Sequence, residues 1–289
     1  MSTELKTLNG YGFDATKLGG LDAQYYAQGR AAHNLLDNSN FRNPVNQRGI
    51  TSTGDVGYNI DRWKKENASG TVTIGNNYIA MTGTGAYWFL TQFVPTNKIK
   101  SGAVYTIALS DTSGSVGVCS TVMSTDMTKF TARHTFTSGA VVAINVEYTS
   151  DKYAVYFTSN SSAETRFAWA ALYEGSYTAD TLPAYQPKGY AAELAECQRY
   201  YYAVENELLF SAWADTNGCL DYTVLLPQTM RAIPTVTFDK LQYIDESGYV
   251  SFTNSPYYTG RDRVAIRKLS LTLNKAYGLS VKFSASADL

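Results

Sequence analysis

Apolar and polar residues alternate along most of the chain with a period of two, the pattern of half-buried strands. Between residues 34 and 187 the alternation recurs in short runs, separated by turns that contain glycine and serine, such as Ser113-Gly114. The clearest runs are residues 105–109, 130–136, 142–148, 153–157 and 167–173. About eight short strands at this spacing predict an antiparallel β-sandwich of the jelly-roll kind.

The same alternation returns in residues 206–289. The strand candidates there are residues 208–214, 220–226, 235–238, 241–244, 249–252, 264–273 and 279–283. Glu246-Ser247-Gly248 is a hairpin turn, and residues 254–260 form the longest loop. The pattern predicts a second, smaller sandwich, so the fold class is all-β with two sandwiches.

One segment between the two blocks has the period of a helix. Its apolar positions fall at spacings of four, three and four and form one stripe: Tyr190, Leu194, Cys197 and Tyr201. Much of the remaining helix surface is charged: Glu193, Glu196 and Arg199. A helix this short is marginal alone, so packing must hold it. We therefore predict a connecting helix within residues 188–205 that joins the sandwiches.

Composition limits the classes of partner. With 289 residues the chain is long enough for two cores, and residues 1–33, which carry little alternation, are predicted to be an attachment or linker segment. Charged residues make up 17% and the net charge is −1, which argues against nucleic acid and anionic membranes as partners. No apolar stretch approaches the ~20 residues of a membrane span, so no membrane insertion is expected.

Catalysis has little support in the sequence. His33 falls in the linker segment, and His134 lies on an alternating apolar face, where a packing role is the ordinary one. No phosphate loop, nucleophile elbow or zinc-protease pattern is present. The three cysteines, Cys119, Cys197 and Cys219, are irregularly spaced, so no metal site and no cofactor is predicted. We expect no catalytic residues.

Three stretches, in order, carry a family resemblance. They are residues 18–27 with Leu18-Gly19-Gly20-Leu21, residues 34–63 with Asn34-Leu35-Leu36-Asp37-Asn38 and Asp61-Arg62-Trp63, and residues 171–201 with Leu182-Pro183-Ala184-Tyr185-Gln186-Pro187. Together they resemble bacteriophage and prophage tail-fibre or receptor-binding proteins over roughly residues 18 to 235.

The resemblance implies a carbohydrate-binding-like sandwich over residues 34–187 and a C-terminal tip domain over residues 206–289. It also implies a homotrimer located in the virion tail and assembled in the host cytoplasm. The N-terminal segment would bind other tail or baseplate proteins, and the ligand would be a bacterial surface carbohydrate. An envelope polysaccharide depolymerase and a purely structural spacer of the virion remain alternatives.

Aromatic and small polar side chains suit sugar recognition, because rings cover apolar C–H faces while polar groups bond hydroxyls. The preferred carbohydrate-contacting cluster lies in and after the loop near residue 257: Tyr257, Tyr258, Arg261 and Asp262. Three consecutive aromatic residues at 87–89 on one strand cannot leave both faces solvated, so one or two are expected to be buried, and Tyr87 and Trp88 are the second candidates, with Trp88 as an exposed platform. Trp63 and Trp169 are assigned to the core.

The helix stripe formed by Tyr190, Leu194, Cys197 and Tyr201 has two interpretations. It forms the threefold contact of the predicted trimer, or it packs on the chain's own sandwich. The spacing alone does not separate them.

Overall fold

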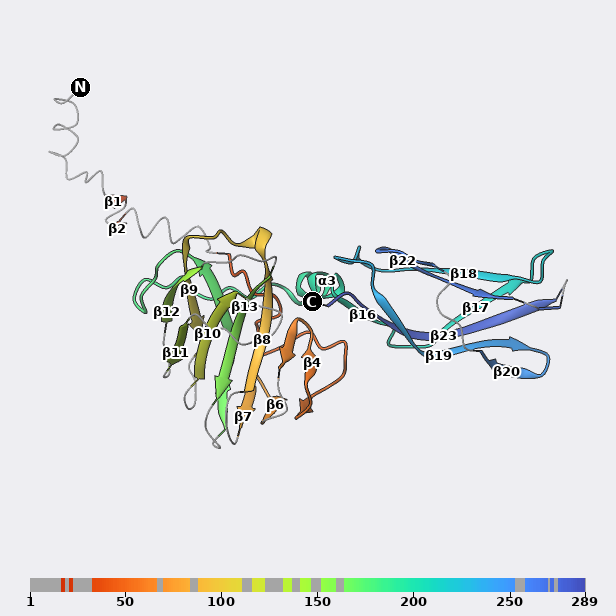
Figure 1. Ribbon diagram of the computed structural model, residues 1–289, viewed down its shortest axis with the longest axis horizontal. Coiled ribbons are helices and arrows are strands. Elements are labelled where there is room, and N and C mark those ends of the chain that lie inside the picture. Colours follow the sequence, from red (N-terminus) through yellow and green to blue (C-terminus); the bar gives the residue numbers. More distant parts are fainter. Residues whose placement is uncertain are drawn as a thin grey trace, which may run out of the picture.

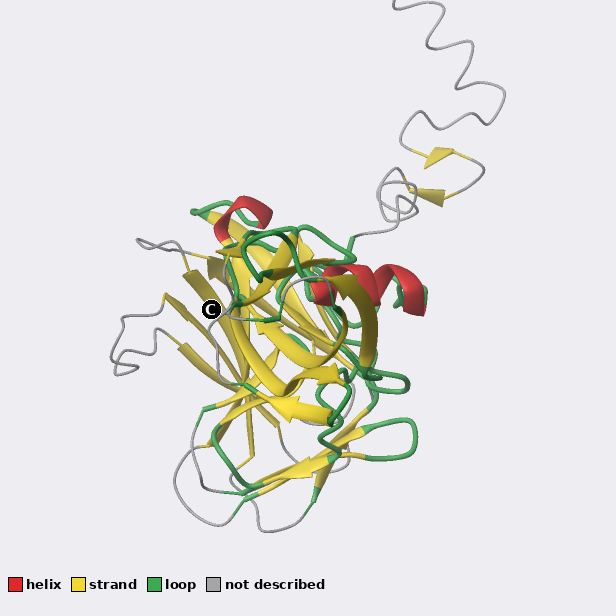
Figure 2. Cartoon of the chain, turned by 90° about the vertical axis from the view of Figure 1, so that its right-hand side faces the viewer, coloured by secondary structure: helices red, strands yellow, loops and turns green. Residues whose placement is uncertain are grey.

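The computed structural model describes residues 17–18, 21–22, 33–66, 70–83, 88–110, 116–122, 132–136, 141–146, 152–159, 164–252, 258–269, 271–272 and 275–288. Two β-sandwiches lie end to end, with helix α3 (Tyr190–Gln198) between them (Figure 1). Viewed along its long axis, the part of the chain that is coloured consists almost entirely of strands and loops (Figure 2). The all-β fold predicted from the alternation is confirmed.

The first sandwich has a six-stranded antiparallel sheet on one side. Its order is β11 (Ala132–Phe136), β10 (Val116–Val122), β13 (Lys152–Ser159), β8 (Trp88–Pro95), β5 (Trp63–Lys65) and β4 (Gly57–Ile60). The short 3-10 helix η1 (Thr96–Lys98) follows β8 directly. Strand β13 of this sheet presents alternate residues to the core, namely Tyr153, Val155 and Phe157, as the period of two requires.

Two smaller antiparallel sheets supply the other side of the core. One has the order β12 (Val141–Val146), β9 (Ala103–Leu109), β15 (Ala170–Glu174). The other has the order β14 (Thr165–Phe167), β7 (Ile79–Thr82), β6 (Thr71–Ile74), β3 (Ser52–Thr53). Strands β14 and β15 are separated only by residues 168–169, so the chain passes from one sheet to the other at that point.

Aromatic rings fill the core of the first sandwich. Trp63 stacks on Phe157 with ring centroids 5.4 Å apart, and Phe167 makes an edge contact with Phe41 at 5.3 Å. Trp63 is fully buried, and its indole Nε1 donates a 2.9 Å hydrogen bond to the carbonyl oxygen of Asn38. The assignment of Trp63 to the core is confirmed.

The second sandwich is organised around one long strand, β23 (Ala276–Ser286). It pairs with β16 (Tyr201–Ala203), β17 (Leu208–Trp213) and β19 (Thr235–Asp245), and β19 pairs with β20 (Gly248–Ser251). The opposite sheet has the order β18 (Leu220–Leu225), β22 (Arg263–Lys268), β21 (Tyr258–Thr259). A core separate from that of the first sandwich lies between the sheets, with Val281 and Phe283 of β23 fully buried in it.

Strand β19 differs from the sequence prediction. Residues 235–238 and 241–244 were expected to be two strands, but β19 runs unbroken through both. The register against β23 shifts between Phe238 and Lys240, which marks a β-bulge. An extra residue in a bulge disturbs the alternation just as a turn does, and the sequence pattern does not separate the two. The predicted hairpin turn is confirmed, because Asp245 pairs with Gly248.

The N-terminal region is described at β1 (Lys17–Leu18), β2 (Leu21–Asp22) and His33, and β1 pairs antiparallel with β2. No helix in the part of the chain that the structure describes is long and apolar enough to cross a membrane.

Two tryptophans test the assignment of the core. Trp63 is fully buried, whereas Trp213 is 69% exposed on β17. We expect Trp63→Ala to lower the free energy of unfolding by about 3–5 kcal/mol, because it leaves a large cavity. The same change at Trp213 should cost less than about 0.5 kcal/mol. Denaturant unfolding followed by circular dichroism measures both, and equal losses would contradict the packing described here.

Candidate functional site

The structure describes three of the side chains predicted to contact carbohydrate: Tyr258, Arg261 and Asp262. Tyr87 and Tyr257 lie outside the described residues, and Trp88 begins β8 with its side chain outside the described part. The three described residues come from β21 and the turn that leads into β22, at the edge of the three-stranded sheet.

Tyr258 stands on the outer face of this sheet. It pairs with Ala265 of β22, whose neighbours Val264 and Ile266 point into the core, so Tyr258 points outward and is 56% exposed. At Gly260 an added Cβ would lie 3.2 Å from the Tyr258 ring and 3.2 Å from Asp262 Oδ1. The ring and the carboxylate therefore converge over Gly260, where a side chain would separate them.

Arg263 holds the Asp262 carboxylate in place. Its Nε donates to Asp262 Oδ1 at 3.0 Å and its Nη2 donates to Oδ2 at 2.8 Å. These hydrogen bonds lower the pKa of the exposed Asp262 carboxyl, so the carboxylate stays ionised. An oriented carboxylate keeps lone pairs free to accept from a hydroxyl. We call Tyr258, Asp262 and Arg263 the Tyr258 cluster.

Arg261 has a structural role instead of joining this cluster. Its Nε donates to the carbonyl oxygen of Met230 at 2.7 Å, and the Met230 amide donates to the Arg261 carbonyl oxygen at 2.7 Å. The Leu226 amide donates to the Asp262 carbonyl oxygen at 2.8 Å. The turn is thereby tied to residues 226–230, and this gives the Tyr258 cluster a firm base.

A second aromatic site lies in the first sandwich, around Trp169, which is partly buried against a small cluster of Ala108, Ala171 and Tyr173. Trp169 was assigned to the core because it shares its alternation with Phe167 and Ala171. The structure leaves it partly exposed, stacked on Tyr185 with ring centroids 4.5 Å apart and planes 6° apart. It lines a hollow of about 340 Å³ together with Arg42 and Ser110.

The reason is local. Strand β14 ends at Phe167 and β15 begins at Ala170, so Trp169 lies in the break between two strands. Strict alternation does not continue through a break. Burial raises the pKa of the Tyr185 phenol to about 12, so this hydroxyl remains a hydrogen-bond donor at neutral pH.

The side of helix α3 that faces the core is not the apolar stripe that the sequence predicted. Its buried residues are Glu193 and Cys197, whereas Tyr190 is 50% exposed and Leu194 is partly buried. Cys197 lies inside its own chain, so it cannot contact a second copy. Tyr201 lies beyond the helix, in β16, and is partly buried. The predicted stripe therefore does not form a single exposed face.

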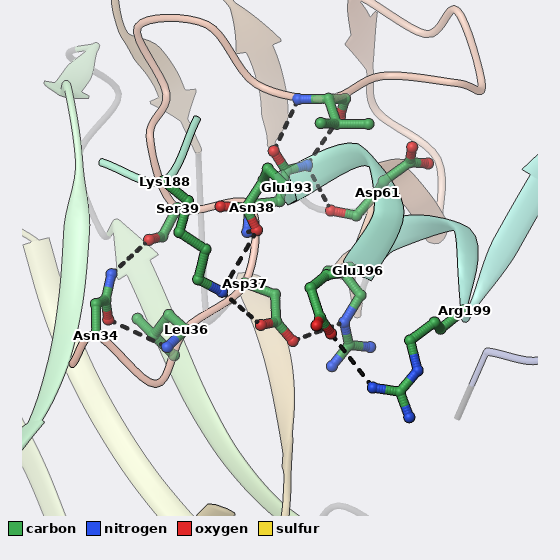
Figure 3. A network of polar contacts seen from close by, with 12 residues as sticks. Asn34, Leu36, Asp37, Asn38, Ser39, Asp61, Lys188, Glu193, Glu196 and Arg199 are labelled. Atoms are coloured by element: carbon green, nitrogen blue, oxygen red, sulfur yellow. Dashed lines mark hydrogen bonds and ion pairs between the residues drawn. The ribbon is translucent and has the colours of Figure 1, made fainter. Parts of the chain in front are cut away.

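Glu193 was expected on the charged surface of the helix, and its burial corrects that expectation. Its carboxylate accepts a hydrogen bond from the backbone amide of Asn38, and Lys188 Nζ lies 3.9 Å away (Figure 3). Burial raises the pKa of the Glu193 carboxyl. The predicted pair of Glu196 and Arg199 is present on the exposed side, with 3.4 Å between Oε2 and Nη1.

Asp37 is the most strongly paired carboxylate near the helix. It is 1% exposed, and three cations reach it: Lys98 Nζ at 2.8 Å, Lys188 Nζ at 3.2 Å and Arg62 Nε at 3.4 Å. Burial by itself would raise the pKa of Asp37, but the three positive charges outweigh it and lower the pKa to about 2. Figure 3 shows Asp37 and Lys188 beside α3.

Asn38 holds together the stretch of residues 34–63, one of the three that carry the family resemblance. Its Nδ2 donates to the carbonyl oxygens of Val45 and Asp61, both at 2.8 Å, and its Oδ1 accepts from the Val45 amide. Its φ is +50°, in the left-handed region that asparagine tolerates better than most residues. Asn38 is thus a structural residue of the 34–63 stretch, which the sequence did not reveal.

The chain matches no protein-family model and no curated protein. Among solved structures it is similar to a CBM4 structure, at 13% identity and a TM-score of 0.32 over 48% of this chain and 99% of that one. It is also similar to the CBM22-1–GH10 modules of a Clostridium thermocellum endo-1,4-beta-D-xylanase complexed with xylohexaose. That match has 10% identity and a TM-score of 0.30, over 48% of this chain and 30% of that one.

A third similar structure is the CBM22-1–CBM22-2 tandem domain from Paenibacillus barcinonensis. Its identity is 11% and its TM-score 0.29, over 90% of this chain and 98% of that one. At such identities and TM-scores, what these proteins bind cannot be carried over to this chain. Within the described ranges, no group of His, Cys, Asp and Glu side chains is arranged to hold a metal ion.

The lowered pKa of Asp37 predicts a pH-dependent contribution to stability. The ionised carboxylate stabilises the folded state above its ordinary pKa of 3.8, and this contribution is lost as the pH falls toward 2. We expect Asp37→Asn to lower the free energy of unfolding by about 3–5 kcal/mol at neutral pH, since three cations lose their partner. The gap between wild type and variant should shrink by about 2 kcal/mol between pH 4 and pH 2.

Urea unfolding at several pH values measures this gap. Glu193 and Asp61 are present in both proteins, so their raised pKa values largely cancel in the difference. Glu174→Gln is the control, because the Glu174–Lys100 pair is exposed and should contribute under about 1 kcal/mol. A gap that does not change with pH would show that the Asp37 carboxylate is not held ionised by its neighbours.

Proposed function

We propose that this protein attaches to a bacterial surface glycan without catalysis, as a receptor-binding protein of a phage or phage-derived tail. The observation that carries the glycan-binding part is the Tyr258 cluster. There an exposed ring and a carboxylate fixed by Arg263 converge over Gly260 on the outer face of a sheet. An aromatic face beside oriented polar groups is the combination that a pyranose needs.

The chemistry favours a glycan with little charge. Asp262 is neutralised by Arg263, and towards the other end of β22 Asp221 is neutralised by Arg267 through contacts of 2.5 and 2.6 Å. Both pairs keep hydrogen-bonding atoms at the surface, since Asp262 and Arg263 are each 48% exposed and Asp221 is 51% exposed. A surface of such ion pairs forms hydrogen bonds with hydroxyl groups, and the ligand needs no net charge.

The phage assignment rests on the resemblance of the three sequence stretches, taken in order. It places residues 1–33 against other tail or baseplate proteins and the second sandwich away from that attachment. A homotrimer in the virion tail would present three Tyr258 clusters, and multivalency raises avidity even though each contact is weak.

Two alternatives make different predictions in a single experiment. Incubation with purified envelope polysaccharide distinguishes a binding protein from a depolymerase and from a structural spacer. A binding protein retains the polysaccharide intact, whereas a depolymerase releases oligosaccharides. A structural spacer of the virion shows neither retention nor release.

Tyr258 is the position where a single change tests this proposal. We expect Tyr258→Ala to weaken polysaccharide retention at least about tenfold, because the ring supplies the stacking surface. Tyr258→Phe should retain most of the binding. Tyr249→Ala is the matched control, because Tyr249 is a tyrosine of similar exposure, 59%, on β20 in the other sheet.

Affinity electrophoresis in gels that contain the polysaccharide measures retention, and thermal unfolding checks that each variant is folded. Unchanged retention in Tyr258→Ala would overturn the placement of the ligand. Equal losses in Tyr258→Ala and Tyr249→Ala would point to a general effect on the sandwich.

A further inference from the structure

A groove runs along the joint between the two sandwiches. Its volume is about 430 Å³, which falls in the range of ~300–1,000 Å³ typical of ligand sites. One wall is helix α3, the opposite wall is residues 202–206 with Leu208, and one end is formed by residues 46–47 of the first sandwich. We call it the joint groove, and every residue that lines it is among the described ones.

The helix wall is a straight line of side chains. Tyr190, Leu194 and Gln198 are four residues apart and so stack along one side of α3. Glu193 and Cys197 occupy the neighbouring line and face the core. One side of the helix is therefore packed against the protein. The adjacent side, which includes the half-exposed Tyr190, lines the groove.

The polar groups that line the groove are mostly uncharged. Asn46, Gln198 and Asn206 contribute amides that both donate and accept, and Tyr190 and Tyr202 contribute phenols. The one ionisable acid is Glu205, and no Lys or Arg lines the groove. Leu194 and the neighbouring aliphatic side chains of the opposite wall give it an apolar floor.

Asn46 lines the groove on the side of the first sandwich. Its Nδ2 donates to the carbonyl oxygen of Ile50 at 3.0 Å, whereas its Oδ1 is buried and has no hydrogen-bond partner among the described residues. A buried acceptor left without a partner costs about 1–3 kcal/mol, and this one lies beneath the surface of the groove. The unused acceptor lies at the end of the groove where the first sandwich meets the joint.

Tyr202 is fixed in the opposite wall. Its ring makes an edge contact with Phe283 of the second core at 6.2 Å between centroids. Burial and the nearby Glu205 carboxylate raise the pKa of the Tyr202 phenol. This hydroxyl therefore remains a donor at all physiological pH values.

We propose that the joint groove is a binding site for a neutral saccharide of one or two units. Amides and phenols match hydroxyls that both donate and accept, and the apolar floor with the Tyr190 ring suits the C–H face of a pyranose. The absence of a cation from the lining disfavours anionic sugars. The site is separate from the Tyr258 cluster and rests on its own residues.

Titration calorimetry of the full chain with glucose, galactose, N-acetylglucosamine, maltose and lactose at millimolar concentration tests the proposal. We expect at least one to bind, and Tyr190→Ala or Gln198→Ala to weaken that affinity about tenfold, the loss of one good contact. Both residues lie on the surface of the helix, so the variants should fold, which thermal unfolding checks. Glu196→Gln, on another side of α3, is the matched control and should bind as wild type does.

A measurement on the unaltered protein makes the test independent of the variants. The side-chain amide signals of Asn46, Gln198 and Asn206 should shift in nuclear magnetic resonance spectra on addition of the saccharide that binds. Failure of every neutral saccharide to bind would overturn the proposal. So would binding that persists unchanged in both variants.

The outcomes also separate this proposal from the function proposed above. Saccharide binding that is lost in Tyr190→Ala but kept in Tyr258→Ala supports the joint groove even if no polysaccharide is retained. Saccharide binding lost only in Tyr258→Ala assigns it to the other site and overturns the groove.

Discussion

The ion pairs of the buried Asp37 carboxylate are the interaction on which the placement of helix α3 beside the first sandwich depends. A carboxylate with 1% exposure is unfavourable unless positive charges compensate it, and the compensation comes from three places in the chain. Arg62 belongs to the β4–β5 turn, Lys98 to η1, and Lys188 to the segment that leads into α3. Pairing them with one anion brings these segments to a common point. The position of the helix follows, because Lys188 precedes it directly and Glu193 accepts from the amide next to Asp37.

The second sandwich is attached through the same region. The end of the last strand returns to the helix, where the Ala287 amide donates to the carbonyl oxygen of Tyr200 at 2.7 Å. The Arg231 amide donates to the carbonyl oxygen of Arg199 at 2.8 Å, and Arg48 forms ion pairs with both Asp61 and Asp288. Hydrogen bonds and ion pairs therefore link the two separate cores through the joint. The joint groove lies in the same region and is lined by residues of the first sandwich, the helix and the start of the second sandwich.

Three surfaces share one kind of chemistry. The Tyr258 cluster, the hollow beside Trp169 and the joint groove each combine an aromatic ring with amides, hydroxyls or a paired carboxylate. They differ in how the ring is supported: Tyr258 by a turn bonded to residues 226–230, Trp169 by stacking on Tyr185, and Tyr190 by the helix. A chain with 17% charged residues and a net charge of −1 offers such surfaces little long-range electrostatic attraction, so the binding proposed for them rests on short-range stacking and hydrogen bonding.

The alternation of apolar and polar residues was sufficient to predict the all-β class, the two blocks and the helix between them, because strand and helix periods are local properties of the chain. Tertiary structure alone decided which residues the sites contain. Glu193 reads as a surface residue until Asn38, 155 positions away, supplies its donor. Trp169 reads as part of one continuous core face with Phe167, but in the structure it packs with Tyr185 against a small separate cluster. The strand break at 168–169 and the bulge near residue 239 both interrupt a period of two, and only pairing with other strands shows where the chain is interrupted. Periodicity records the preference of each residue for water or core, whereas a site requires partners distant in sequence, and their meeting is a property of the folded chain.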